Sequence, residues 1–272
     1  MAEQIPEQSG AMPAQQGAMC IHTNRITDVC LDKDCIEDLR VYLTEDAQAL
    51  LDQSAGARAR SVELLTASID VEELGFQRGY DSVDLTFYYR VRGDVSSGGV
   101  RAGELDGVAV FSKRVVLFGG ESGTKIYSSR RPALSEPYTQ QLPEAIVEVI
   151  DPMVLSSRVL EANPDQPREV VEIPEQIQAL FPQPLVLEGD GRRMYLTIGQ
   201  FSTVRLEREA QLTLSGGRYC VPRKSCCADS GCQEDPCDVF SRIEFPYQSF
   251  FPRDGGCDGA GVQEEAGPGG TG

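Results

Sequence analysis

The clearest feature of the chain is the alternation of apolar and polar side chains in two long segments, residues 82–92 and 201–214. Arg208 interrupts the apolar face of the second segment. A period of two places successive side chains on opposite faces of a β-strand, so both segments are predicted to be strands with one face in a core. The residues expected to face the core are Val83, Leu85, Phe87, Tyr89 and Val91 in the first strand, and Val204, Leu206, Ala210, Leu212 and Leu214 in the second.

Shorter segments of strand-like composition fill much of the remaining chain, and Gly and Pro are frequent between them, as is typical of turns. Many strands at short spacing with few helices predict a mainly β fold. We expect either an antiparallel β-sandwich or two related β units, with one or two short helices. The further strands are predicted over residues 62–74, 107–118, 125–128, 145–150, 153–160 and 194–198.

Two short helices are predicted. The first covers residues 44–53, where Thr44 is a candidate N-cap and acidic residues follow it in the first turn. Leu50 and Leu51 would face the core in this helix. The second covers residues 174–180, which begin with a proline, a residue favoured in the first turn of a helix.

Composition divides the chain into five parts. Gln-, Glu- and Gly-rich residues at the start and Gly-rich residues at the end lack periodicity and are predicted to be disordered tails. The cysteine-rich and aromatic stretch near the end is predicted to be an extension of the β structure. The predicted parts are residues 1–18 (tail), 19–135 (β unit with the N-terminal cysteines), 136–222 (second β unit or second half of the same domain), 223–253 (extension) and 254–272 (tail).

The chain is strongly acidic. Its 25 Lys and Arg residues against 42 Asp and Glu residues give a formal net charge of -17. Such a charge repels phosphate backbones and anionic lipid surfaces, so we expect protein partners or self-association rather than binding to nucleic acid or a membrane. The first residues lack the basic start and apolar run of a secretory signal, which predicts a cytoplasmic protein.

The nine cysteines are segregated at the two ends of the core. Cys20, Cys30 and Cys35 precede the first predicted helix. Five others, Cys220, Cys226, Cys227, Cys232 and Cys237, follow the last long strand, and Cys257 lies in the C-terminal tail. Because the ends of a domain commonly lie close together, the two groups are predicted to form one patch.

The spacing of the cysteines leaves their chemical state open. Four residues separate Cys30 from Cys35, a looser spacing than that of paired zinc ligands. With one histidine in the chain, a metal centre would be dominated by thiolates and would hold zinc or an iron–sulfur cluster. The alternatives are reduced structural thiols and disulfides. The candidate metal ligands are Cys30, Cys35, Cys226, Cys227, Cys232 and Cys237.

An acidic cluster lies among the N-terminal cysteines, before the first predicted helix. It lacks the spacing and central glycine of an EF-hand calcium loop, so its side chains are expected to be solvated in turns and caps rather than to bind calcium. The residues of the cluster are Asp28, Asp32, Asp34, Glu37 and Asp38.

Two further groups of residues are candidates for function. Cys20 and His22 are the one conceivable nucleophile pair, although a structural role is expected for them. Near the C-terminus, aromatic residues between two prolines are predicted to be extended, and either to dock on another subunit or to seal the domain's own sheet. These aromatic residues are Phe245, Tyr247, Phe250 and Phe251.

Four segments carry a resemblance to a known family. They read CxxxxC followed by EDLRVYLT (residues 30–44), GYDSVDLTFYYRV (79–91), FSKRVVLFGGE (111–121) and IGQFSTVRLEREAQL (198–212). Together they resemble an uncharacterised family of spore-forming, mostly clostridial Firmicutes, which has no assigned activity. The alternating β pattern is also similar to the small β domains of spore-coat morphogenetic proteins. This resemblance implies a mother-cell protein, destined for the cell's cytoplasm or the spore surface, whose cysteines crosslink when lysis exposes them to oxidant.

The sequence therefore predicts a non-enzymatic structural or assembly protein. The strand-rich pattern, the single histidine and the cysteine patch favour it. The first alternative is a metal-binding module with a thiolate-ligated zinc or iron–sulfur centre. The second is an enzyme that uses Cys20 or a pair of carboxylates.

Overall fold

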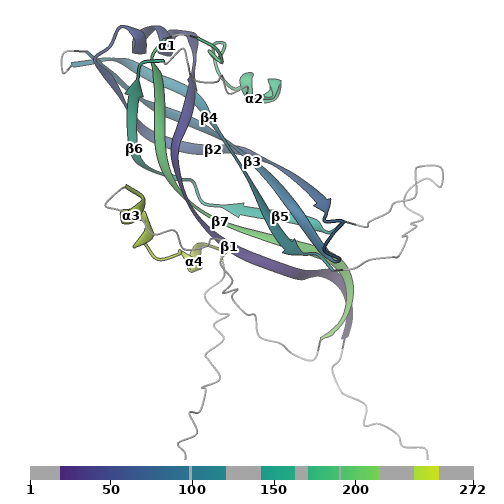
Figure 1. The fold of residues 1–272 in the computed structure, drawn as a ribbon. Helices are drawn as coiled ribbons and strands as arrows, with labels where there is room; N and C mark the ends of the chain where they lie inside the picture. Colours follow the sequence, from purple (N-terminus) through teal and green to yellow (C-terminus); the bar gives the residue numbers. More distant parts are fainter. Residues whose placement is uncertain are drawn as a thin grey trace, which may run out of the picture.

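A computed structural model of the protein describes residues 19–97, 100–120, 142–162, 171–189, 191–214 and 236–250. Within these residues, seven antiparallel strands form a sheet of order β2-β3-β4-β1-β7-β5, with β6 also paired to β7 (Figure 1). The predicted mainly β fold with short helices is confirmed. The elements are β1 (Met19–Leu43), α1 (Glu45–Asp52), β2 (Gly56–Glu73), β3 (Tyr80–Ser97), β4 (Val100–Phe118), β5 (Glu144–Val149), β6 (Met153–Leu160), α2 (Glu175–Gln178), β7 (Arg193–Leu214), α3 (Pro236–Ser241) and α4 (Tyr247–Phe250).

The strands fall into two layers, which Figure 1 shows one behind the other. One layer contains β2, β3 and β4, and the other contains β1, β7 and the pair β5 and β6. The layers are joined where residues 41–43 of β1 pair with residues 107–109 of β4. The core lies between them, and both layers contribute fully buried apolar side chains to it, including Leu85, Phe87, Leu196 and Ile198.

The outer edges of the two layers also approach each other, which makes the sandwich nearly barrel-shaped. β5 and β6 act as two halves of one edge strand that is interrupted before Met153. Side chains from this interrupted strand accept hydrogen bonds from the backbone of β2. Ala59 N donates to Ser157 Oγ over 3.4 Å, and Leu64 N donates to Asp151 Oδ1 over 3.0 Å.

The alternating segments become strands as predicted. In β3, the five residues predicted to face the core are all fully buried. In β7, Val204 and Leu206 are fully buried as predicted, but the prediction is wrong for Leu212, which is 36% exposed because it lies where β7 extends past β5. The predicted strands over residues 201–214 and 194–198 join into the single strand β7. The predicted strand over residues 125–128 lies outside the described residues, as do both predicted tails.

The longest strand, β1, was not expected from the sequence. It pairs with β7 over most of its length, with register shifts between Ile26 and Asp28 and between Ile36 and Leu39. The second shift contains Asp38, whose φ of 53° lies in the left-handed region. Each shift reverses the face on which the following side chains lie, so the alternation is broken twice and the sequence pattern does not identify the strand.

The helix α1 was predicted over residues 44–53, but two details of that prediction are wrong. The Thr44 side chain does not cap the helix, because its hydroxyl donates to the Asp106 carbonyl oxygen over 3.4 Å. Leu51 is fully buried as expected, whereas Leu50 is 36% exposed. The short helix α2 follows Pro174 as predicted, and its Ile177 packs in an apolar cluster on the outer face of β1, β3 and β4.

The aromatic run near the C-terminus was predicted to be extended, and this is wrong for its second part. Residues 247–250 form the helical turn α4, because Pro246 can begin a turn and its carbonyl oxygen accepts a hydrogen bond from Ser249 N at 2.9 Å. Phe245 packs edge-on against Phe201 of β7, with ring centroids 5.5 Å apart, and so helps to cover the sheet. Tyr247 remains 42% exposed.

Candidate functional site

The structure brings together cysteines from the two ends of the chain. Cys35 of β1 and Cys237 of α3 form a disulfide with 5.6 Å between their Cα atoms, although 202 residues separate them in sequence. Cys30, on the other face of β1, also forms a disulfide, whose partner lies outside the described residues. The disulfide state is one of the three that the sequence left open.

The Cys35–Cys237 disulfide anchors a segment that we call the C-terminal arm, residues 236–250. Phe240 of the arm is 1% exposed and packs on Phe201, with ring centroids 4.8 Å apart. Its ring lies so close to Gly199 of β7 that a Cβ atom there would be 2.5 Å from Phe240 Cδ2. The absence of a side chain at Gly199 therefore provides the space in which the arm docks.

Lys33 of β1 holds the other side of the arm. Its Nζ donates to the carbonyl oxygens of Ser241 and Ile243, each over 2.7 Å, and lies 5.1 Å from the centre of the Phe240 ring. Partial burial of the ammonium lowers the pKa of Lys33. The arm is thus fixed to the sheet by a covalent bond, an aromatic contact and a cation.

Of the predicted metal ligands, the structure describes Cys30, Cys35 and Cys237, while Cys226, Cys227 and Cys232 lie outside the described residues. The sulfur atoms of Cys35 and Cys237 and a carboxylate oxygen of Glu37 lie within 4.8 Å of one another. Sequence reasoning did not include Glu37 among the ligands. Its position two residues after Cys35, on the same face of a strand, was the signal available. The metal assignment stays a prediction.

A buried charge cluster crosses the space between the two layers. It consists of Asp32 and Asp34 on the inner face of β1 and Lys113 on β4. The Lys113 ammonium forms ion pairs with both carboxylates. All three side chains are buried: Asp32 is 4% exposed, Asp34 14% and Lys113 12%. Lys113 also lies 5.7 Å from the centre of the Phe87 ring. β1 and β4 pair only at residues 41–43 and 107–109, and the cluster connects the same two strands where they no longer pair.

The burial of the cluster changes its acid–base behaviour. Burial raises the pKa of Asp34 to about 6, an effect that Lys113 opposes and the neighbouring Asp32 reinforces. Next to the cluster, Tyr89 of β3 donates a hydrogen bond of 2.5 Å to Gln200 Oε1 of β7. Burial also raises the pKa of the Tyr89 hydroxyl. Both sets of contacts fasten one layer to the other.

The expectation that the acidic cluster is solvated in turns is therefore wrong for two of its members. Asp32 and Asp34 face the core because the first register shift of β1 directs them inward. Asp28 accepts hydrogen bonds from Val29 N and Phe118 N. Glu37 and Asp38 are exposed as expected, and Asp38 forms an ion pair with Arg158.

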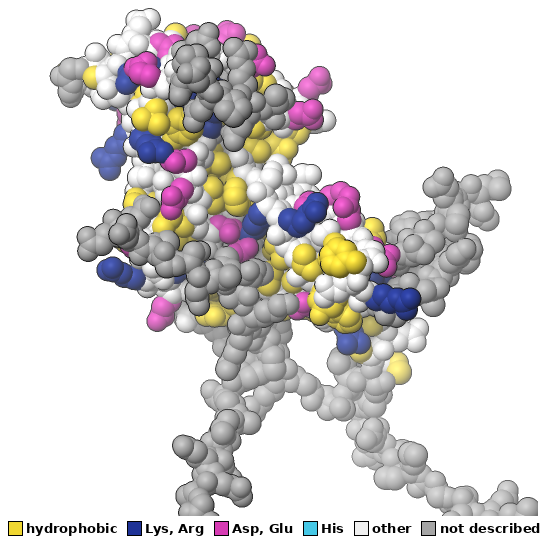
Figure 2. Space-filling model, viewed as in Figure 1, with side chains coloured by type: hydrophobic (Ala, Val, Ile, Leu, Met, Phe, Trp, Pro, Cys, Tyr) yellow, Lys and Arg dark blue, Asp and Glu magenta, His cyan; other side chains and the backbone are white. Residues whose placement is uncertain are grey.

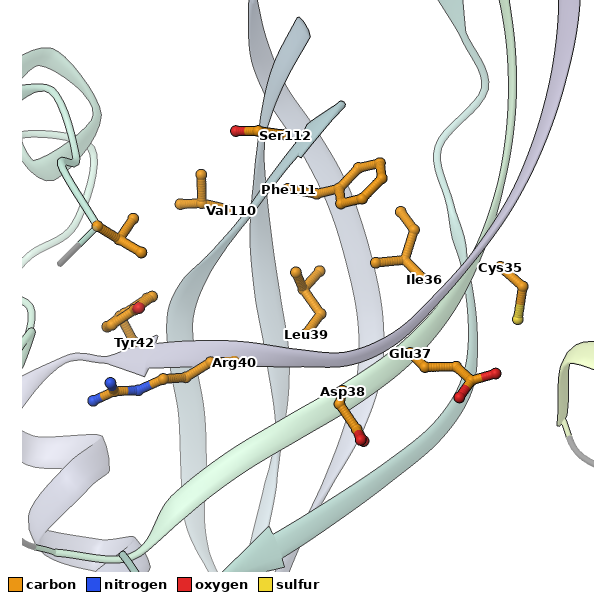
Figure 3. Close-up of a pocket in the computed structure, with 11 residues that line it drawn as sticks. Cys35, Ile36, Glu37, Asp38, Leu39, Arg40, Tyr42, Val110, Phe111 and Ser112 are labelled. Carbon is orange, nitrogen blue, oxygen red and sulfur yellow. The ribbon is translucent and has the colours of Figure 1, made fainter. Parts of the chain in front are cut away.

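A cleft of about 350 Å³ opens where β1 and β4 diverge. Figure 3 shows Ile36, Leu39 and Phe111 pointing into the space between the strands, whereas Glu37 and Asp38 point away from it. Polar groups line the cleft as well, among them Arg40, Tyr42 and Ser112, so its lining combines apolar and polar side chains.

The start of β1 and the end of β7 form a two-stranded structure that we call the β1–β7 ribbon. In it, residues 19–25 of β1 pair with residues 208–214 of β7. β5 pairs with β7 only as far as Glu207 and β4 ends at Phe118, so in the described part of the chain the ribbon has two strands. Cys20 and His22 are exposed on it, and His22 Nε2 lies 3.9 Å from Glu209 Oε2.

Figure 2 shows how charged and apolar side chains are distributed over one face of the protein. On the face in Figure 2, acidic and basic side chains are interspersed rather than gathered in one patch of either sign. Apolar side chains gather there towards the end where β5 and β7 run together. In the part of the chain that the structure describes, no helix is long and apolar enough to span a membrane.

Comparisons with known proteins identify no relative. No family model matches the chain, and neither the curated proteins nor the solved structures contain a match.

Proposed function

We propose that the protein is a non-enzymatic structural or assembly protein that associates with further copies of itself through the β1–β7 ribbon. The supporting observation is that this ribbon extends past the neighbouring strands as only two strands of the described chain. Two strands alone are marginally stable in water, and a third strand or a packed face is needed to stabilise them. A second copy of the chain would provide it.

The side chains of the ribbon are arranged for such a contact. Ile21 lies opposite Leu212 and Thr23 lies opposite Ala210, which gives one largely apolar face. The other face carries polar pairs such as His22 with Gln211. Leu212 is 36% exposed, so part of the apolar face is open to solvent.

The charges of the two ribbon edges favour pairing between copies. Within the ribbon, β1 carries Arg25 and no carboxylate, whereas β7 carries Glu209 and Arg208, and the Arg208 side chain donates to the carbonyl oxygens of Gly119 and Gly120. Arg25 on the β1 edge of one copy would therefore be matched by Glu209 on the β7 edge of another. Because these edges differ, the contact is head-to-tail, and it can extend beyond a dimer into a larger assembly.

The mass of the full chain in solution tests this proposal. Native mass spectrometry and size-exclusion chromatography with light scattering, over a series of concentrations, should give masses above the 29.7 kDa of one chain. The substitution Leu212→Glu adds a charge to the apolar face and should shift the protein towards the monomer. Gln211→Glu adds the same charge to the polar face and should have a much smaller effect.

The two variants separate specific contact from general repulsion, because both make the chain more acidic by one charge. Circular dichroism establishes that each is folded. A wild-type protein that remains a monomer at every concentration would refute the proposal. So would equal effects of the two substitutions.

The resemblance to a family of spore-forming bacteria supports a role in spore assembly, with the protein made in the mother-cell cytoplasm. Head-to-tail association is suited to building a layer or a filament. Disulfides such as Cys35–Cys237 would then keep each unit rigid in an oxidising setting.

A thiolate metal centre is the second candidate function, and it is supported by the proximity of Cys35, Glu37 and Cys237. A dithiol reductant would supply two electrons and two protons to convert the disulfide into two thiols, and would itself become a disulfide. Zinc would then displace the thiol protons. Elemental analysis of reduced, tag-free protein tests this function, and less than about half an equivalent of metal would refute it. Glu37→Gln should lower zinc retention, whereas Asp38→Asn should not.

A further inference from the structure

Two arginines lie side by side on the outer face of the sheet with little to balance their charge. Arg40 of β1 lies opposite Tyr195 of β7, so it is a diagonal neighbour of Arg193 on the same face. Diagonal neighbours in an antiparallel pair are within reach of long side chains. Two positive charges on neighbouring positions repel each other, and an anion bound between them would offset this repulsion.

The contacts of these arginines do not supply that anion within the described residues. Arg40 Nη2 donates to the Leu187 carbonyl oxygen over 3.2 Å, and its guanidinium lies 4.6 Å from the centre of the Tyr42 ring. Arg193 Nε is buried and has no hydrogen-bond partner. Neither arginine forms an ion pair with a described carboxylate, in a chain whose net charge is -17.

The nearby carboxylates are engaged elsewhere. Asp52 Oδ1 accepts hydrogen bonds from Gln48 Nε2 and from the backbone N of Arg192, both over 2.9 Å. Glu161 lies 3.3 Å from Arg192 Nε. Arg192 in turn donates to the Ser54 carbonyl oxygen over 2.6 Å. Arg192 thus ties the loop before β7 to the end of α1 and leaves Arg40 and Arg193 to a different partner.

The two arginines line a pocket of about 150 Å³ together with Arg192, Val186 and Gly189. Asp52 and Gly191 line it too, and Gly191 leaves no room for a side chain, because a Cβ atom there would be 2.7 Å from Asp52 Oδ1. The volume is about five times the roughly 30 Å³ that a water molecule occupies in the liquid. It is large enough for a small tetrahedral anion.

We propose that this pocket binds a phosphate group, held by the guanidinium groups of Arg40 and Arg193. Guanidinium presents several N–H donors in a fixed plane and matches the oxygens of a phosphate in pairs. The phosphate would offset the positive charge of both guanidinium groups. It can be free inorganic phosphate or the phosphate of a monoester.

Isothermal titration calorimetry on the full chain tests the proposal, with inorganic phosphate and O-phosphoserine as separate probes at constant ionic strength. Wild type should bind at a single site. The substitutions Arg193→Gln and Arg40→Gln should each weaken binding about tenfold or more, the value of a lost charged hydrogen bond. Arg158→Gln, which removes an exposed arginine that pairs with Asp38, is the matched control and should bind as wild type does.

The comparison of probes identifies the source of the phosphate. Tighter binding of inorganic phosphate indicates the free ion, and tighter binding of phosphoserine indicates a monoester. A second variant, Arg193→Lys, keeps the charge but loses the planar group, so it should bind phosphate with intermediate affinity if Arg193→Gln fails to fold. Wild type that binds neither probe overturns the proposal, as do Arg193 and Arg40 variants that bind as tightly as the control.

Discussion

Replacement of Lys113 by methionine provides a direct test of the buried charge cluster. Methionine has a similar length and keeps the apolar part of the lysine side chain, but it removes the positive charge between Asp32 and Asp34. Two carboxylates, 4% and 14% exposed, would then face each other without a cation. The substitution therefore isolates the electrostatic contribution of Lys113 from its packing.

The magnitude follows from the burial of the cluster. Removing one partner of a buried ion pair costs about 3–5 kcal/mol, because the remaining charge is left uncompensated. Lys113 lowers the pKa of Asp34, so its loss should raise that pKa above the value of about 6 in the wild type. In acidic buffer Asp34 then becomes protonated and can donate a hydrogen bond to Asp32. The cost of the substitution should fall by at least half between about pH 8 and about pH 5.

Urea unfolding of the oxidised protein, followed by far-UV circular dichroism, measures the free energy of unfolding at both pH values. Circular dichroism suits this chain because it contains no tryptophan. Arg114→Met is the matched control, since Arg114 is the next residue of β4 and its ion pair with Asp84 is exposed. The control should change stability little at either pH.

Addition of Asp34→Asn to the Lys113→Met protein provides a further check. It removes one of the two unpaired carboxylates and should recover part of the lost stability at the higher pH. A Lys113→Met protein as stable as the control at about pH 8, or a loss of stability independent of pH, would contradict the proposed burial of the charges.

Three further predictions concern neighbouring contacts. The pKa of Asp34 is about 6 in the folded protein, whereas its ordinary value is 3.8. Between pH 3.8 and about pH 6 the folded protein therefore binds more protons than the unfolded chain, and the free energy of unfolding should decrease as the pH rises through this window. The decrease should be about 3 kcal/mol in urea titrations, and Asp34→Asn should abolish this part of it. Tyr89→Phe leaves Gln200 Oε1 buried without its donor and should cost about 1–3 kcal/mol in the same assay, with recovery on adding Gln200→Leu. Gly199→Ala should displace Phe240 and speed the reduction of the Cys35–Cys237 disulfide by dithiothreitol, whereas Gly56→Ala, with no atom within 4 Å of the added Cβ, should not.

The sequence predicts the strands that keep one register and fails where the register shifts. β3 keeps its alternation through the buried residues from Val83 to Val91, because they face the same core on one side. β1 loses its alternation at residues 26–28 and 36–39. Its inner face also carries Asp32 and Asp34, which resemble turn residues in the sequence, although Lys113 balances them in the structure.

The candidate site was predictable in part for the same reason. The segregation of cysteines in the sequence indicates which ends of the chain approach each other, but spacing along the chain does not identify pairs. Cys35 meets Cys237 because β1 and β7 pair and because Gly199 leaves room for Phe240 of the arm. Arg40 and Arg193 are 153 positions apart, and only the β1–β7 register shows that they are neighbours.

The contacts that join the two layers explain why a long β1 can tolerate two register shifts. Its ladder with β4 covers only residues 41–43, so backbone hydrogen bonds alone would leave most of β1 attached to one layer. Lys113 connects β4 to β1 through Asp32 and Asp34, and Tyr89 connects β3 to β7 through Gln200. Side-chain contacts of this kind require inward-facing side chains but no backbone ladder between the two strands. The first shift supplies the inward orientation of the two carboxylates, so the irregularity that hides β1 in the sequence also creates the cluster that holds it against the second layer.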